Sequence, residues 1–177
     1  MENYQTEKFK VGLIIAKAQP FHNGHVRIIS DALMQCNEVI VVFLNYDTAF
    51  FDYNFNQQSS REIFGTNKRI AYYGLRTEYL NGVSTIKEVI LKVLEKLDEA
   101  GYNKPEYFFT HYDDWVEPAK ECMLWTTRIS TLPDTDSATI YNSVISKTDY
   151  WKDKVPYALV DKTEMYILTK FKELEGN

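Results

Sequence analysis

Residues 11–25 read Val-Gly-Leu-Ile-Ile-Ala-Lys-Ala-Gln-Pro-Phe-His-Asn-Gly-His, and this stretch decides the fold. Residues 11–16 form a nearly unbroken apolar run, which is typical of a strand buried on both faces of a sheet. After the run, apolar residues recur at helical spacing, at Val26, Ile29, Leu33 and Cys36. The stretch therefore predicts a buried parallel strand that leads into a helix, with His22, Gly24 and His25 at the turn.

The turn between this strand and this helix is expected to bind phosphate. The first amides of a helix lack partners within it and lie at the positive end of its dipole, which attracts anions. Imidazoles on both sides of Gly24 add hydrogen-bond donors at the same place. The alternative is a tight turn with Gly24 for backbone geometry and histidines that only face solvent. Two of the chain's three histidines occur at this turn, which favours a binding site.

The rest of the chain alternates between predicted strands and helices. Further strands are expected over 38–44, 106–110 and 126–132, and helices over 61–79, 84–100, 118–124, 137–146 and 162–174. This alternation predicts an α/β fold with a doubly wound parallel sheet. The segment 45–60 has no clear period and is expected to be a loop, either a binding loop or a packed surface excursion.

Length and composition limit the class of protein. With 177 residues, we expect a single domain over 1–177, with a core over about 10–160 and a C-terminal helix over 162–174. The net charge of −5 argues against nucleic acid polymers and favours a small, locally recognised anion. Cys36 and Cys122 fit neither a metal cluster nor a disulfide framework, so we expect no protein-built metal site and a reducing, cytoplasmic location. No apolar run is long enough for a bilayer, so no membrane partner is expected.

Residues 19–25, Gln-Pro-Phe-His-Asn-Gly-His, resemble the HxGH signature of the nucleotidylyltransferase superfamily. Residues 17–22 are similar to the Gly-Arg-Phe-Gln-Pro-Phe-His start of nicotinamide mononucleotide (NMN) adenylyltransferases, both the archaeal type and the bacterial bifunctional type that also carries a ribosylnicotinamide kinase. Further resemblances to these enzymes follow in the expected order, at 61–69 (an Arg-x-Pro-Phe-type segment), 136–142 (Ile-Ser-Ala-Thr-x-Ile-Arg) and 150–156 (Trp-x-x-x-Val-Pro).

The resemblance implies a Rossmann-like fold and transfer of AMP from ATP to NMN, which gives NAD and pyrophosphate with Mg²⁺ on the triphosphate. It also implies three sets of site residues. The catalytic residues would be His22, His25 and Lys17. The nucleotide-binding residues would be Ala16, Gln19, Phe21, Gly24, Arg61, Arg69, Ser137, Thr139 and Asn142. The acceptor would contact Phe50, Asp113 and Trp115, and a homo-oligomer is compatible because this superfamily often forms oligomers.

The sequence departs from the family pattern at two positions that would hold phosphate. Asn142 stands where the second signature ends in Arg, and Lys17 replaces an Arg with a cation that lacks the planar fork. These departures leave open a nucleotide-binding homologue without catalysis. Asp113-Asp114-Trp115 resembles a segment of cytidylyltransferases, which leaves open AMP or CMP transfer to another acceptor such as phosphopantetheine or a polyol phosphate.

Overall fold

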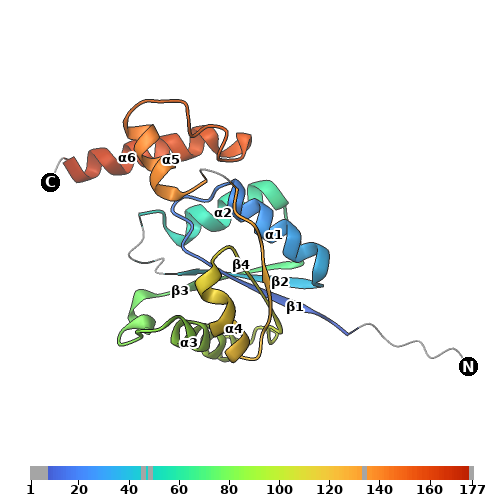
Figure 1. Ribbon diagram of the computed structural model, residues 1–177. Helices are drawn as coiled ribbons and strands as arrows, with labels where there is room; N and C mark the ends of the chain where they lie inside the picture. Colours follow the sequence, from blue (N-terminus) through green and yellow to red (C-terminus); the bar gives the residue numbers. More distant parts are fainter. Residues whose placement is uncertain (1–7, 45–46, 48–49, 133–134, 176–177) are drawn as a thin grey trace, which may run out of the picture.

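A five-stranded parallel sheet forms the centre of the protein, in a computed structural model that describes residues 8–44, 47, 50–132 and 135–175 (Figure 1). The strand order is β3-β2-β1-β4-β5. The strands are β1 (Val11–Ala16), β2 (Glu38–Leu44), β3 (Ile70–Leu75), β4 (Tyr107–Thr110) and β5 (Trp125–Arg128). The chain extends the sheet in one direction from β1 to β3 and then in the other through β4 and β5. The expected α/β fold with a doubly wound sheet is therefore confirmed, and its switch point lies between β1 and β4.

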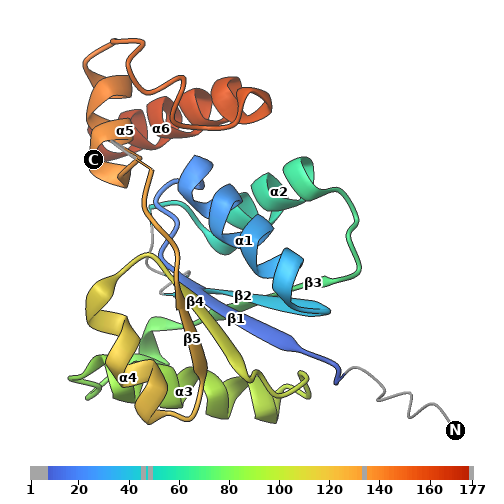
Figure 2. The same ribbon diagram turned by 45° about the vertical axis from the view of Figure 1, so that its right-hand side comes forward.

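Helices cover both faces of the sheet (Figure 2). On one face lie α1 (Asn23–Gln35) and α2 (Tyr53–Phe64), and on the other lie α3 (Ile86–Glu99) and α4 (Val116–Glu121). Successive residues of β1 face opposite layers, so Ile14 packs in the α1 cluster while Leu13 and Ile15 pack in the α3 cluster. This double burial explains why the strand reads as a continuous apolar run.

Two C-terminal helices form a further layer beyond the carboxyl ends of the strands. These are α5 (Ser137–Ile145) and α6 (Val160–Glu175), which lie above α1 and α2 in Figure 2. They pack on the start of α2 through a separate apolar cluster that contains Phe51, Ile140 and Ile167, with Trp151 only 1% exposed. Short 3-10 turns also occur, η1 (Thr77–Leu80), η2 (Asp113–Trp115) and η3 (Tyr157–Leu159).

The helix predicted over 61–79 is wrong beyond Phe64, and the loop predicted over 45–60 is wrong from Tyr53 onward, while residues 45–46 and 48–49 of that loop lie outside the described residues. Asp52 caps α2 by accepting a hydrogen bond from the Phe55 amide, so the helix begins at Tyr53, inside the expected loop. Gly65 ends it with a φ of 63°, a conformation that glycine adopts without strain. The following residues pair with β2 as the edge strand β3. In addition, the strand expected over 126–132 ends at Arg128.

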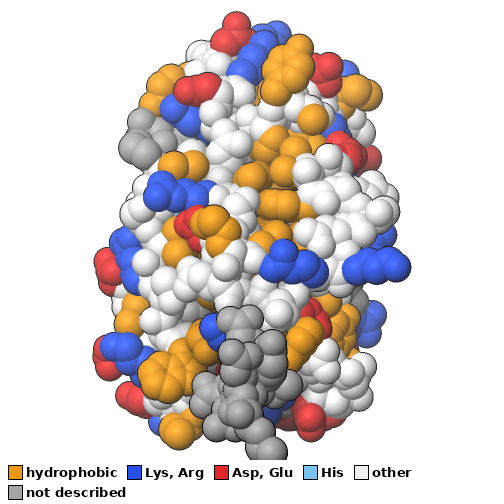
Figure 3. Space-filling model, turned by 90° about the vertical axis from the view of Figure 1, so that its right-hand side faces the viewer, with side chains coloured by type: hydrophobic (Ala, Val, Ile, Leu, Met, Phe, Trp, Pro, Cys, Tyr) orange, Lys and Arg blue, Asp and Glu red, His pale blue; other side chains and the backbone are white. Residues whose placement is uncertain are grey.

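Charged side chains of both signs are interspersed on the face of the molecule shown in Figure 3. No large patch of Lys and Arg stands out among the described residues on this face. Within the described part of the chain, no helix combines the length and apolarity needed to cross a bilayer.

Candidate active site

The turn between β1 and α1 is held by a reciprocal pair of histidine hydrogen bonds. His22 is the N-cap of α1, and its Nδ1 accepts from the Gly24 amide at 3.1 Å. Nδ1 of His25 accepts from the His22 amide at 3.2 Å. These two bonds form a capping box in which histidines replace the usual hydroxyl and carboxylate side chains. Because Nδ1 accepts in both rings, each neutral imidazole carries its proton on Nε2.

The first amides of α1 are all hydrogen-bonded within the protein, which corrects the expectation that they are free to bind phosphate. The Asn23 amide donates to the Lys154 carbonyl at 2.9 Å, and the amides of His25 and Val26 donate to the His22 carbonyl at 2.9 and 3.2 Å. Together with the amides of His22 and Gly24, they leave no unpaired backbone N–H over residues 22–26. Attraction for an anion therefore comes from the helix dipole and from the histidine Nε2 hydrogens.

Both signature histidines are uncharged in the free protein at neutral pH. Burial lowers the pKa of His22 to about 4, the charge of His111 adds to this effect, and Asp136 opposes it. Burial also lowers the pKa of His25 well below its usual range, helped by His22 and His111. The two rings lie 4.0 Å apart between centroids. They can act as paired neutral donors, whereas the sequence suggested charge-assisted ones.

A cavity of about 480 Å³, here called the main cavity, opens at the carboxyl ends of β1 and β4. Seven of the residues that the sequence predicts for the site line it: Ala16, Lys17, Gln19, His22, Gly24, His25 and Ser137. The two imidazoles and the start of α5 thus share one cavity, at the switch point where open α/β sheets bind ligands. Its volume is in the range of small-molecule sites.

A smaller cavity of about 330 Å³, here called the side cavity, adjoins the main cavity. The two share Gln19 and Ser137 in their linings. Phe50 and Asn142 line the side cavity, and the Phe50 ring contacts Tyr141 edge to face at 5.4 Å between centroids. These residues form an aromatic wall next to the histidine site.

The Gln19 side chain fixes the boundary between the two cavities. Its Nε2 donates to the carbonyl oxygens of Phe51 at 2.9 Å and Lys17 at 3.1 Å. Its Oε1 accepts from the Phe51 amide at 2.8 Å. Two of these three hydrogen bonds join the β1 turn to the segment before α2, and the third, to Lys17, stays within the turn.

Two predicted residues support the site without lining either cavity. Phe21 is fully buried, and its ring stacks on His25 at 5.4 Å between centroids. Thr139 donates its amide and its hydroxyl to the Asp136 carboxylate, at 2.8 and 2.6 Å. These bonds lower the pKa of Asp136. Thr139 therefore caps α5, and its donors are not free for a phosphate as expected.

Four further predicted residues line neither the main cavity nor the side cavity. The Arg69 guanidinium donates to carbonyls of Leu33, Cys36 and Asn37 at the end of α1, because Arg69 precedes β3 and lies at the opposite edge of the sheet. The Arg61 guanidinium lies over the Tyr72 ring. Trp115 stacks on Phe108 at 6.1 Å, and Asp113 forms an ion pair with Arg128.

Two residues that the sequence prediction omitted, His111 and Asp136, also line the main cavity. His111 follows directly after β4, and this position past the end of a buried strand was the available signal. Asp136 is the N-cap of α5, directly before Ser137. The sequence pattern indicated this capping role for Asp136 but no place in the site. The described residues contain no group of three or more His, Cys, Asp and Glu that could hold a metal ion.

Comparison with known proteins gives matches among solved structures alone. No protein-family model and no curated protein matches the chain. A bifunctional NMN adenylyltransferase/ADP ribose pyrophosphatase from Francisella tularensis superposes with a TM-score of 0.61 and 16% identity, covering 95% of this chain and 55% of that one. The same enzyme with AMP and a manganese ion gives a TM-score of 0.60 and 14% identity, covering 96% and 54%.

The NadR protein in complex with NAD and AMP-PNP is also similar, with a TM-score of 0.53 and 15% identity over 82% of this chain and 44% of that one. The present chain thus spans about half the length of these proteins or less. At such low identity the likeness shows the fold. The chain has the Rossmann-like α/β arrangement of these nucleotide-binding enzymes.

Proposed function

We propose that this protein transfers AMP from ATP to NMN, with release of pyrophosphate and formation of NAD. The observation that carries the proposal is the convergence of His22, His25 and the start of α5 on the main cavity, at the sheet's switch point. Solved structures of similar fold are NMN adenylyltransferases or nucleotide-binding proteins, with AMP in one and NAD and AMP-PNP in another. This similarity supports nucleotides as substrates.

The proposed reaction needs alignment and charge stabilisation, with no covalent enzyme intermediate. A phosphate oxygen of the acceptor attacks the α-phosphorus, the bond from this phosphorus to the bridging oxygen of the β-phosphate breaks, and pyrophosphate leaves with the electron pair. The Nε2 hydrogens of His22 and His25 would donate to oxygens around the α-phosphate, and the exposed Lys17 ammonium would approach the departing phosphates. Removal of one such donor lowers the rate by roughly 10²–10³.

A magnesium ion fits this site only as part of the bound triphosphate. Asp136 is the one carboxylate among the described residues that line the main cavity, and both of its oxygens accept hydrogen bonds from Thr139. Mg²⁺ commonly keeps its waters and binds phosphate oxygens with few protein ligands, and it neutralises charge on the pyrophosphate when bound. No closed set of protein ligands is therefore required.

The side cavity is the proposed place for the acceptor ring. Phe50 and Tyr141 offer aromatic surface next to the histidines, which suits a nicotinamide ring. Trp115 is packed against Phe108 and Asp113 is paired with Arg128, so neither residue is available to the acceptor. Both cysteines are free thiols, in keeping with a reaction in the cytoplasm.

A nucleotide-binding protein without catalysis is the second candidate, and the charges around the main cavity favour it. Lys17 is the single Lys or Arg among the described lining residues, and Asp136 offsets its charge. Asn142 lies in the side cavity where the family pattern has an Arg. The site is therefore poor in fixed positive charge for a triphosphate.

The test is pyrophosphate release measured with ATP or CTP against NMN, phosphopantetheine and glycerol phosphate, beside calorimetric binding of each nucleotide. Release with ATP and NMN supports the proposal, and His25→Ala should abolish it. Met34→Ala, at a 78% exposed position on the same helix, should not. Release with CTP but not with ATP and NMN indicates CMP transfer. Binding of ATP with no release from any pair supports the second candidate.

A further inference from the structure

His111 bridges two backbone carbonyl groups that belong to distant parts of the chain. Its Nε2 lies 2.9 Å from the Gly24 carbonyl oxygen in the first turn of α1, and its Nδ1 lies 3.0 Å from the Ile129 carbonyl oxygen just after β5. Gly24 stands between the two signature histidines. His111 thus connects the histidine turn to the segment that leads from β5 toward α5.

Both partners of the imidazole are acceptors, which determines how many protons it carries. A neutral imidazole has one N–H donor and one bare nitrogen, and a bare nitrogen facing a carbonyl oxygen at this distance is repelled by it. Only the doubly protonated ring donates to both carbonyl oxygens. His111 lies at the wall of the main cavity, where a doubly protonated ring would satisfy both carbonyl oxygens and a neutral ring only one.

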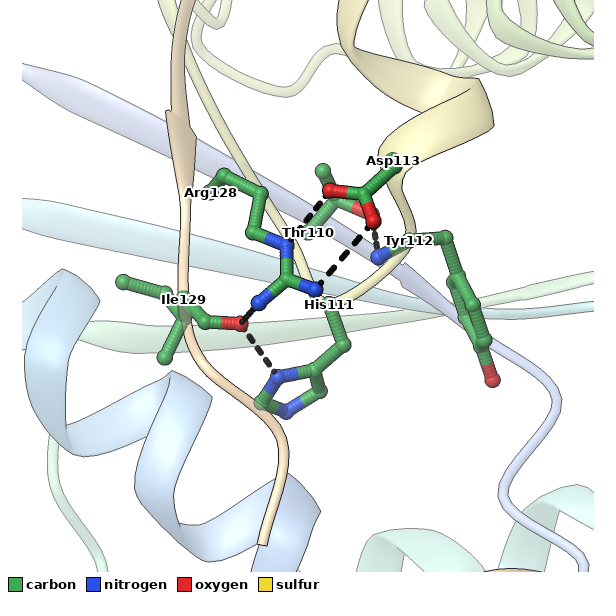
Figure 4. A network of polar contacts seen from close by, with 6 residues as sticks. All are labelled: Thr110, His111, Tyr112, Asp113, Arg128 and Ile129. Atoms are coloured by element: carbon green, nitrogen blue, oxygen red, sulfur yellow. Dashed lines mark hydrogen bonds and ion pairs between the residues drawn. The ribbon is translucent and has the colours of Figure 1, made fainter.

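The Ile129 carbonyl is itself held from a second side (Figure 4). Nη1 of Arg128 donates to it at 3.2 Å, while Nε and Nη2 donate to the two oxygens of Asp113 at 2.9 and 3.4 Å. A chain of polar contacts thus runs from Asp113 through Arg128 and the Ile129 carbonyl to His111. The Tyr112 amide also donates to the Thr110 hydroxyl at 3.1 Å, which fixes the backbone on both sides of His111.

We infer that His111 is a positioning residue of the nucleotide site: its ring ties the first turn of α1 to the exit of β5, and in its doubly protonated form it adds a positive charge to that of Lys17 in the main cavity. Loss of the imidazole releases both carbonyl groups, so nucleotide binding should weaken. The inference rests on the proposed function only in its use of ATP as the ligand.

The experiment compares the wild type with His111→Gln and His111→Phe. Gln keeps donors that do not titrate, whereas Phe keeps a ring without hydrogen bonds. Calorimetry at one fixed pH should show that His111→Phe binds ATP about tenfold more weakly than the wild type, as expected for loss of one charge-assisted contact. His111→Gln, which restores a hydrogen-bond donor, should bind with an affinity between the two. Asp114→Asn, an exposed position on the same segment, should behave as wild type.

Hydrogen exchange of the ligand-free protein separates this inference from the proposed function. His111→Phe should speed amide exchange in the peptides around 23–30 and 129–132, and His111→Gln should do so less. If neither the wild type nor any variant binds ATP, the proposed function fails. Hydrogen exchange then still decides the role of His111. Unchanged exchange in both peptides of His111→Phe, or wild-type affinity of this variant for ATP, overturns the inference.

Discussion

Replacement of Gly24 by alanine should displace the His22 ring while the helix stays intact. Gly24 lies in α1, where alanine suits the backbone. An added Cβ would lie 2.8 Å from Cε1 and 3.0 Å from Nδ1 of His22, and 3.5 Å from the Thr135 hydroxyl. Ordinary contact begins at 3.4 Å, so the ring must move by about 0.6 Å, the difference between 3.4 and 2.8 Å.

This shift should affect nucleotide binding and turnover more than stability. Loss of the His22 cap costs about 1 kcal/mol of the free energy of unfolding, and the higher helix propensity of alanine returns a similar amount. A misplacement of about 1 Å lowers the rate by about 10², so about 0.6 Å should lower it by roughly tenfold. We therefore expect about a tenfold loss of kcat/KM for ATP with little change in stability.

The assay for Gly24→Ala measures pyrophosphate release and ATP affinity, with urea unfolding on the same sample. Met34→Ala, exposed on the same helix, is the matched control and should leave all three unchanged. Full ATP affinity and turnover in Gly24→Ala would refute the close contact with His22. A drop in stability of several kcal/mol would show that the helix itself had been disturbed.

Three further outcomes are expected. The pKa of His22 falls from 6.5 to about 4 on folding, so the unfolded state binds more protons between these two pH values. The free energy of unfolding should therefore fall by about 2–3 kcal/mol as pH drops from 6.5 to 4. Urea titrations should show a smaller fall for His22→Asn, which keeps a capping acceptor. Asp136→Asn keeps the α5 cap but removes a negative charge from the main cavity, so calorimetry at low salt should show ATP affinity a few-fold higher; an unchanged affinity would contradict this. Trp151→Ala should lower the free energy of unfolding by about 3–5 kcal/mol in urea titrations, whereas Tyr157→Ala, 95% exposed, should not.

The sequence predicts the start of the fold well because β1 and α1 have distinct periodicities. A run buried on both faces and a stripe at helical spacing leave little ambiguity over residues 11–35. The main cavity could also be predicted, since carboxyl ends of parallel strands meet at one edge of a sheet. The same reasoning fails for β3, a half-buried edge strand whose Tyr72-Tyr73-Gly74 shows no alternation and whose strand state depends on pairing with β2.

The parts of the site that the sequence prediction missed depend on contacts between distant segments. Histidine is not a usual N-cap, so the pattern showed two potential ligands where the structure also shows a capping box. Arg69 matched a family position, yet its place before β3 directs it to the end of α1. The role of His111 depends on where the chain passes after β5, which no local pattern reveals.

The Gln19–Phe51 contact has a consequence for how this protein could acquire a different acceptor. The Gln19 side-chain amide borders both the main cavity and the side cavity, and it also holds the Phe51 backbone beside the aromatic wall. A substitution that reshapes the aromatic wall to admit another ring must move the Phe51 backbone, and the Gln19 hydrogen bonds pass this movement to the turn that carries the histidines. Acceptor specificity and nucleotide affinity are therefore coupled, and a change in one should select for compensating changes in the other.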